Sequence, residues 1–121
     1  MADREIILTA VTDPSQLELL KKKLGKEGYE IVSAASVTEL VGAIGKKGKI
    51  SMAVVDLSAF DQSVWEPLEN LKKANIPYIV MTTQRSPSAQ RESLKHGASG
   101  LFTKGLRFNE LLEYIHTLLG K

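Results

Sequence analysis

Short apolar runs alternate with longer stretches of helical period along the whole chain. The runs are residues 6–8, 31–32, 52–55, 78–81 and 101–102, and the first and last extend to Val11 and Thr103. They do not alternate polar with apolar residues, which is typical of strands buried on both faces. Strands in strict alternation with helices predict right-handed crossovers and a parallel sheet covered on both faces. We therefore expect an α/β fold with five strand–helix units, doubly wound around a parallel sheet.

The intervening stretches carry recognisable helix start and stop signals. Asp13 followed by Pro14 places a capping acid before a proline at the first helical position, and this helix can end at Gly25 or Gly28. The remaining helices are expected to start at comparable signals, namely at Ser36, between Ser63 and Pro67, at Ser86 and near Phe108.

Length and composition narrow the function classes. The 121 residues predict one domain, residues 1–121, with strand–helix repeats from about 4 to 120. No membrane-spanning run and no secretory signal is present, so we expect a cytoplasmic protein without a membrane partner. The absence of cysteine excludes disulfides, thiol nucleophiles and cysteine-ligated metals. Two histidines, His96 and His116, are too few for a histidine metal site, and both are expected to be polar surface residues.

The net charge of +2 does not point to a nucleic-acid partner. The lysine-rich stretches 21–23 and 46–49 are scattered and carry no interleaved aromatic residues. Such runs are typical of solvated helix faces, so no direct nucleic-acid binding is expected. The aromatic residues Phe60 and Trp65 are interpreted as packing residues that cover the sheet edge.

Polar residues follow directly on three of the apolar runs. Asp56, Thr82 and Lys104 stand at the ends of the third, fourth and fifth expected strands, and Thr83 is an alternative to Thr82. In open α/β sheets, ligands bind beyond the carboxyl ends of the strands. An aspartate there can act as a nucleophile toward phosphorus and form an acyl phosphate. A lysine and a hydroxyl can then hold the phosphoryl oxygens.

From about residue 5 to residue 120, the chain resembles the receiver domain of two-component response regulators. The resemblance rests on residues 54–56, on Thr82 after 76–81, and on the segment Gly-Ala-Ser-Gly-Leu-Phe-Thr-Lys at 97–104. It implies a flavodoxin-like sheet of order 2-1-3-4-5. It also implies that Asp56 accepts a phosphoryl group from a sensor histidine kinase or a phosphotransfer protein. Thr82 would turn toward that group on activation, and Lys104 would bind it.

The chain departs from the family at the metal site. The two consecutive acids that usually hold Mg²⁺ are replaced by Val11 and Thr12, and Asp13 comes one residue late. Asp56, the backbone carbonyl of Ser58 and, as a weaker candidate, Asp13 remain to make a weakened Mg²⁺ site. Asp13 is interpreted as a helix cap in preference to a metal ligand, because Pro14 follows it directly and completes the capping pattern. The other departures from the family pattern are Phe60, Val64, Leu101 and Gly105.

Three functions follow as hypotheses. The first is a receiver switched by phosphorylation, which is not an enzyme beyond self-phosphorylation and slow self-dephosphorylation at Asp56. The domain is either free-standing or cut from a longer regulator, and we expect no output domain after Lys121, so that it would signal through protein contacts. The second is a phosphorylation-independent pseudo-receiver, acting as an interaction or dimerisation module. The third is a flavin- or small-molecule-binding domain, but this chain lacks the glycine that a phosphate-binding loop would need after the first strand.

The resemblance also implies where a downstream partner would bind. In the family, the fourth helix, fifth strand and fifth helix form the face that transmits the phosphorylation state. A homodimer is a further possible arrangement. The residues expected on this face are Ala89, Leu94, Leu101, Phe108 and Glu110.

Overall fold

Strands and helices alternate in the computed structural model, which describes residues 5–47, 50–57, 62–82, 87–103 and 108–120. In these ranges the elements, in chain order, are β1 (Ile6–Ala10), α1 (Pro14–Lys26), β2 (Glu30–Ser33), α2 (Val37–Lys47), β3 (Ile50–Asp56), the 3-10 turn η2 (Gln62–Val64), α3 (Trp65–Lys73), β4 (Tyr78–Thr82), α4 (Pro87–Lys95), β5 (Gly100–Thr103) and α5 (Phe108–Leu118). In the part of the chain so described, no helix is long and apolar enough to cross a membrane.

The strands form one parallel sheet in the order β2-β1-β3-β4-β5, which confirms the predicted fold class and strand order. Ala10 is in register with Val55, Asp56 with Met81, and Thr82 with Thr103. The carboxyl ends of β1, β3, β4 and β5 therefore lie along the same edge of the sheet.

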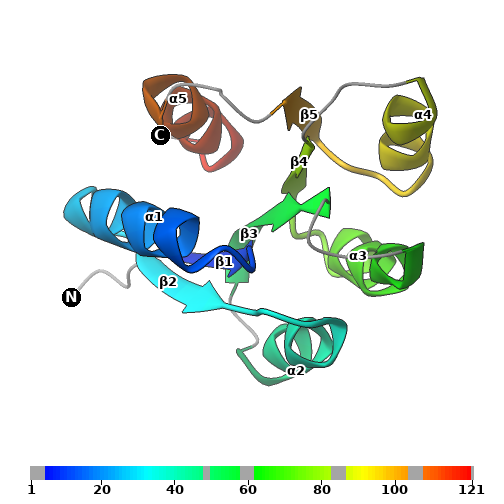
Figure 1. The fold of residues 1–121 in the computed structure, drawn as a ribbon, viewed down its shortest axis with the longest axis horizontal. Helices are drawn as coiled ribbons and strands as arrows, with labels where there is room; N and C mark the ends of the chain where they lie inside the picture. The colour runs from blue at the N-terminus through cyan, green and yellow to red at the C-terminus, as the bar shows by residue number, and fades with distance from the viewer. Residues whose placement is uncertain (1–4, 48–49, 58–61, 83–86, 104–107, 121) are drawn as a thin grey trace.

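Helices cover both faces of this sheet. α1 and α5 lie on one face, and α2, α3 and α4 lie on the other (Figure 1). Because successive side chains of a strand point to opposite faces, Ile7 packs with α1 and α5 while its neighbour Leu8 packs with α2 and α3. Each strand is apolar on both sides, which is why the sequence shows unbroken apolar runs there.

Two of the predicted helix starts, those of α1 and α2, are capped by side-chain hydrogen bonds, whereas Val64 at the start of α3 makes no such bond. The backbone N–H of Ser15 donates to the Asp13 carboxylate at 3.1 Å, and Pro14 opens α1. At α2 the N–H of Glu39 donates to the Ser36 hydroxyl at 3.1 Å, while the Glu39 carboxylate accepts from the N–H of Ala35 at 2.7 Å. These pairs satisfy N–H groups that have no partner inside the helix.

The end of α1 distinguishes the two candidate glycines. Gly25 lies within the helix, and the chain leaves it before Gly28, which adopts a φ of 94°. A glycine accommodates this left-handed backbone because it has no Cβ. Gly28 therefore marks the helix end, whereas Gly25 is an ordinary interior position.

Candidate functional site

Asp56 and Thr82 end adjacent strands at the carboxyl edge of the sheet. Asp56 is the last residue of β3 and is only 2% exposed. It is in register with Met81, so Thr82 lies one residue further along β4. Thr82 is half-buried. The structure thus brings the predicted carboxylate and hydroxyl to neighbouring strand ends, which their separation in sequence alone could not establish.

The third predicted residue follows the next strand along the sheet. Thr82 is in register with Thr103, the last residue of β5, and Lys104 comes next in the sequence. Lys104, Ser58 and Thr83 lie outside the described residues. The structure therefore gives positions for Asp56 and Thr82. For Lys104 it shows only that the preceding residue, Thr103, is the last of β5.

The end of β1 carries an apolar residue where the family pattern has acids. Ala10, the last residue of β1, is in register with Val55, so Val11 directly follows β1 and Asp56 is the next residue of β3. Val11 is fully buried in the apolar cluster beneath α1 and α5, and Thr12 is exposed. Asp13 is exposed and caps α1. The cap interpretation of Asp13 is confirmed.

Of the residues described at this edge of the sheet, Asp56 and Asp13 carry the predicted carboxylate ligands for Mg²⁺. Mg²⁺ takes oxygen ligands in near-octahedral geometry and is usually held by one or two carboxylates together with substrate phosphates. In the stretches that the structure describes, no group of three or more acidic, histidine or cysteine side chains is arranged to hold a metal ion. Among the described acidic residues, Asp56 alone combines burial with a position at the strand edge, since the Asp13 carboxylate is engaged by the start of α1.

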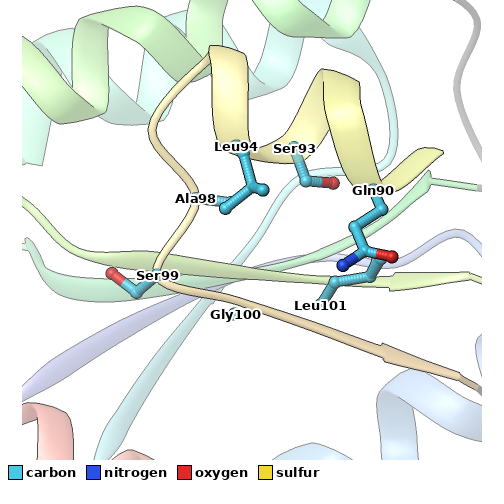
Figure 2. A pocket seen from close by; sticks show the side chains of 7 residues that line it. All are labelled: Gln90, Ser93, Leu94, Ala98, Ser99, Gly100 and Leu101. Carbon is cyan, nitrogen blue, oxygen red and sulfur yellow. The ribbon is translucent and has the colours of Figure 1, made fainter. Parts of the chain in front are cut away.

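A groove lies between α4 and β5, within the face expected to contact partners. Figure 2 shows its lining side chains, and its volume is about 140 Å³. Leu94, on α4, is 69% exposed, and Leu101, on β5, is half-buried. Ser93 is buried within the same lining.

The other residues expected on this face differ in their exposure. Phe108 is half-buried against the α1–α5 cluster, and the Lys23 ammonium lies 5.0 Å from the centre of its ring. Glu110 is exposed, and the side chain of Ala89 lies outside the described part. Among the described residues of this face, the exposed apolar surface is concentrated at Leu94 and the adjoining groove.

The structure corrects the expectation for His96. Its side chain is only 15% exposed, and its ring stacks on Trp65 with the centroids 4.9 Å apart. The Glu69 and Glu92 carboxylates contact its two ring nitrogens. The four-residue spacing of Glu92, on α4, and His96, directly after it, could have indicated half of this cluster, but the contacts from α3 depend on helix packing. Trp65 is buried, as predicted for a packing residue, and Phe60 lies outside the described residues.

Comparison with solved structures identifies similar folds. A response regulator receiver domain protein (CheY-like) from Methanospirillum hungatei JF-1 superimposes with a TM-score of 0.88 and 28% identity, covering 98% of this chain and 95% of that chain. A response regulator from Thermotoga maritima gives a TM-score of 0.85 at 16% identity, covering 98% of this chain and 100% of that chain. The second likeness supports the fold alone.

Two curated plant proteins also match. The two-component response regulators ORR26 of Oryza sativa subsp. japonica and ARR11 of Arabidopsis thaliana are each 25% identical to this chain over 107 residues. The match covers 87% of this chain but only 18% and 20% of those proteins, so the chain spans about a fifth of their length. A family model, described as the response regulator receiver domain, matches residues 7–116. Because this match runs from the first strand to the last helix, the chain belongs to the response regulator receiver domain family.

Proposed function

We propose that Asp56 is the phosphoacceptor of this receiver domain and that residues 1–121 act as one signalling domain. The phosphoryl group would come from a sensor histidine kinase or a phosphotransfer protein. The observation that carries the proposal is the position of Asp56, a nearly buried carboxylate at the carboxyl end of β3, one register step from Thr82. Receiver domains are generally signalling modules without an enzymatic activity toward other molecules.

The proposed transfer is a simple displacement at phosphorus. A carboxylate oxygen of Asp56 forms a bond to phosphorus while the bond from phosphorus to the donor's imidazole nitrogen breaks. The nitrogen keeps the electron pair, and Asp56 becomes an acyl phosphate. The Thr82 hydroxyl is suited to donate a hydrogen bond to a phosphoryl oxygen, and the Lys104 ammonium is assigned to neutralise its charge.

We assign the output of the switch to a protein partner that binds at α4 and β5. The groove there offers an exposed leucine, Leu94, beside the polar side chains of Gln90 and Ser99 (Figure 2). Such a mixture of an apolar anchor and surrounding polar groups suits a protein contact. A test is a Leu94→Arg variant, which should fold normally and lose binding to the partner or to a second copy of the chain.

A second candidate function is a phosphorylation-independent interaction module of the same fold. The buried Val11 beside Asp56 favours it, because the charge that would attract a metal ion is missing there. Receiver domains generally bind Mg²⁺ at the phosphorylation site. A domain without that ion has less means to neutralise the incoming phosphoryl group.

One experiment separates the two functions. The chain is incubated with phosphoramidate, whose P–N bond resembles that of phosphohistidine, with and without Mg²⁺, and its intact mass is measured. The matched control is Asp56→Asn, which keeps the shape of the side chain but removes the nucleophilic carboxylate. One added phosphoryl group in the native chain, absent from the control, supports the phosphoacceptor. If the native chain gains no phosphoryl group while its circular dichroism shows that it stays folded during the incubation, the result supports the interaction module.

A further inference from the structure

His96 contacts both α3 and the end of α4 through its two ring nitrogens and one face of its ring. Its Nδ1 contacts the carboxylate of Glu69 on α3, and its Nε2 lies 3.2 Å from a carboxylate oxygen of Glu92 on α4. One face of its ring lies 15° from parallel to the indole of Trp65, also on α3. The two carboxylates occupy opposite edges of the imidazole, so they do not converge on one metal ion.

Two further contacts hold the same turn of the chain. The hydroxyl of Tyr78, on β4, donates to the backbone carbonyl of His96 at 2.7 Å. The aliphatic part of Lys72, on α3, lies where a side chain at Gly97 would have to be placed. The carboxyl end of α4 is therefore attached to both α3 and the sheet.

The protonation of His96 decides how many of these contacts can form. A neutral imidazole has one N–H donor, whereas the imidazolium has two. Only the imidazolium can donate to Glu69 and Glu92 at the same time. We propose that His96 is a proton-controlled clamp between α3 and α4, complete when the ring is doubly protonated and weakened when it loses one proton.

The cluster can respond to pH through its imidazole, because this is the kind of side chain that ordinarily changes charge between about pH 5 and 8. Burial, and secondarily the charge of Glu69, raises the pKa of Tyr78 to about 12, so its hydroxyl remains a donor over this range. Glu69 and Glu92 contact the ring of His96, and the other charged groups on the packed helices are Lys72, whose aliphatic part lies against Gly97, and the exposed Lys95.

The clamp acts on the helix that borders the groove. Ser93 and Leu94 precede His96 on α4 and its following turn, and both line the groove against β5. A weaker attachment at His96 would let this end of α4 open more readily. The inference does not depend on phosphorylation of Asp56, because it concerns contacts within the domain alone.

Trp65 provides a direct optical test, because it is the single tryptophan of the chain. An imidazolium stacked on an indole quenches its fluorescence. We expect the emission of the native chain to fall as the pH is lowered through the imidazole range. The change should be absent in His96→Gln and retained in His116→Gln, whose site lies on α5.

Hydrogen exchange measures whether protonation of His96 changes the protection of the backbone amides at the end of α4. After correction for intrinsic exchange, the amides of residues 93–98 should be about three- to tenfold more protected on the acid side, the effect of one ordinary hydrogen bond. The effect is small because Glu69 and Glu92 are 45% and 37% exposed. Glu92→Gln should reduce this pH dependence even if His96→Gln alters the packing.

Two results would overturn the clamp. One is a native chain whose Trp65 emission does not titrate, or titrates equally in His96→Gln. The other is a titrating emission with α4 protection that is independent of pH in both the native chain and Glu92→Gln. Neither measurement uses a phosphodonor, so failure of the clamp is distinguishable from failure of the phosphoacceptor.

Discussion

The carboxylate of Asp13 accepts a hydrogen bond from the backbone N–H of Ser15, with oxygen and nitrogen 3.1 Å apart. Its own backbone carbonyl accepts from the N–H of Leu17 at 2.9 Å. The acid closest in sequence to the absent metal-binding pair is therefore part of the start of α1. Both contacts belong to the helix, and neither requires a metal ion.

Removing this cap should destabilise the domain. We expect Asp13→Ala to lower the free energy of unfolding by about 1 kcal/mol, because an N–H of the first turn loses its partner. Asp13→Asn should have little effect, since asparagine caps equally well. Urea unfolding of the two variants and the native chain measures these free energies. Phosphorylation by phosphoramidate should be unchanged in Asp13→Asn, and its loss in this stably folded variant would instead assign Asp13 to the phosphorylation site.

Placing a carboxylate at Val11 should create a metal-responsive site. Val11 is fully buried beside the position of Asp56, so Val11→Asp should cost about 2 to 4 kcal/mol of unfolding free energy without metal. Mg²⁺ should restore part of this loss, because binding to the folded state alone stabilises it. The matched control is Thr12→Asp, at an exposed position, with a change within about 0.5 kcal/mol. An equal response of the native chain to Mg²⁺ would contradict this prediction.

Gly25 and Gly28 form a matched pair that separates the effect of backbone conformation on stability from the effect of steric contact. At neither position does an added Cβ meet another atom within 4 Å, but only Gly28 has a positive φ, of 94°. Gly25→Ala should stabilise the domain by about 0.5 to 1 kcal/mol, because alanine favours the helix interior. Gly28→Ala should destabilise it by about 1 to 2 kcal/mol. Thermal unfolding of both variants tests the prediction, and shifts of the same sign would refute it.

Tyr78 should make stability fall at high pH. Burial, and to a smaller extent Glu69, raises its pKa from 10.0 to about 12 in the folded chain. Below about pH 10 both states hold the proton, so Tyr78 adds no pH dependence there. Between about pH 10 and 12 the unfolded chain releases the proton first. The free energy of unfolding should therefore fall by about 2 to 3 kcal/mol across this interval.

The control for this effect is Tyr78→Phe. It loses the hydrogen bond to His96, which should cost about 1 kcal/mol at neutral pH. Its unfolding free energy should decline less than that of the native chain in urea titrations at about pH 9 and about pH 11.5. Burial also raises the pKa of Tyr29, which is present in both chains, so the difference between them reports Tyr78. Parallel pH profiles would exclude the assignment.

The sequence determined the elements of this protein because their signals are local. Asp13 with Pro14, and Ser36 with Glu39, specify helix starts through contacts that span four residues or fewer. The apolar runs identify strands buried on both faces, since each strand contacts helices on both sides. The candidate residues Asp56 and Thr82 could be selected because both follow such runs directly.

Only the tertiary structure decided which of these residues meet. The register that places Thr82 one step beyond the partner of Asp56 depends on pairing between β3 and β4. His96 was expected at the surface because no local pattern relates it to Trp65 and Glu69, which precede it by about thirty residues. Their contact exists because α3 and α4 cover the same face of the sheet. Local hydrogen bonds can be inferred from neighbouring residues, whereas contacts between helices depend on how the whole chain packs.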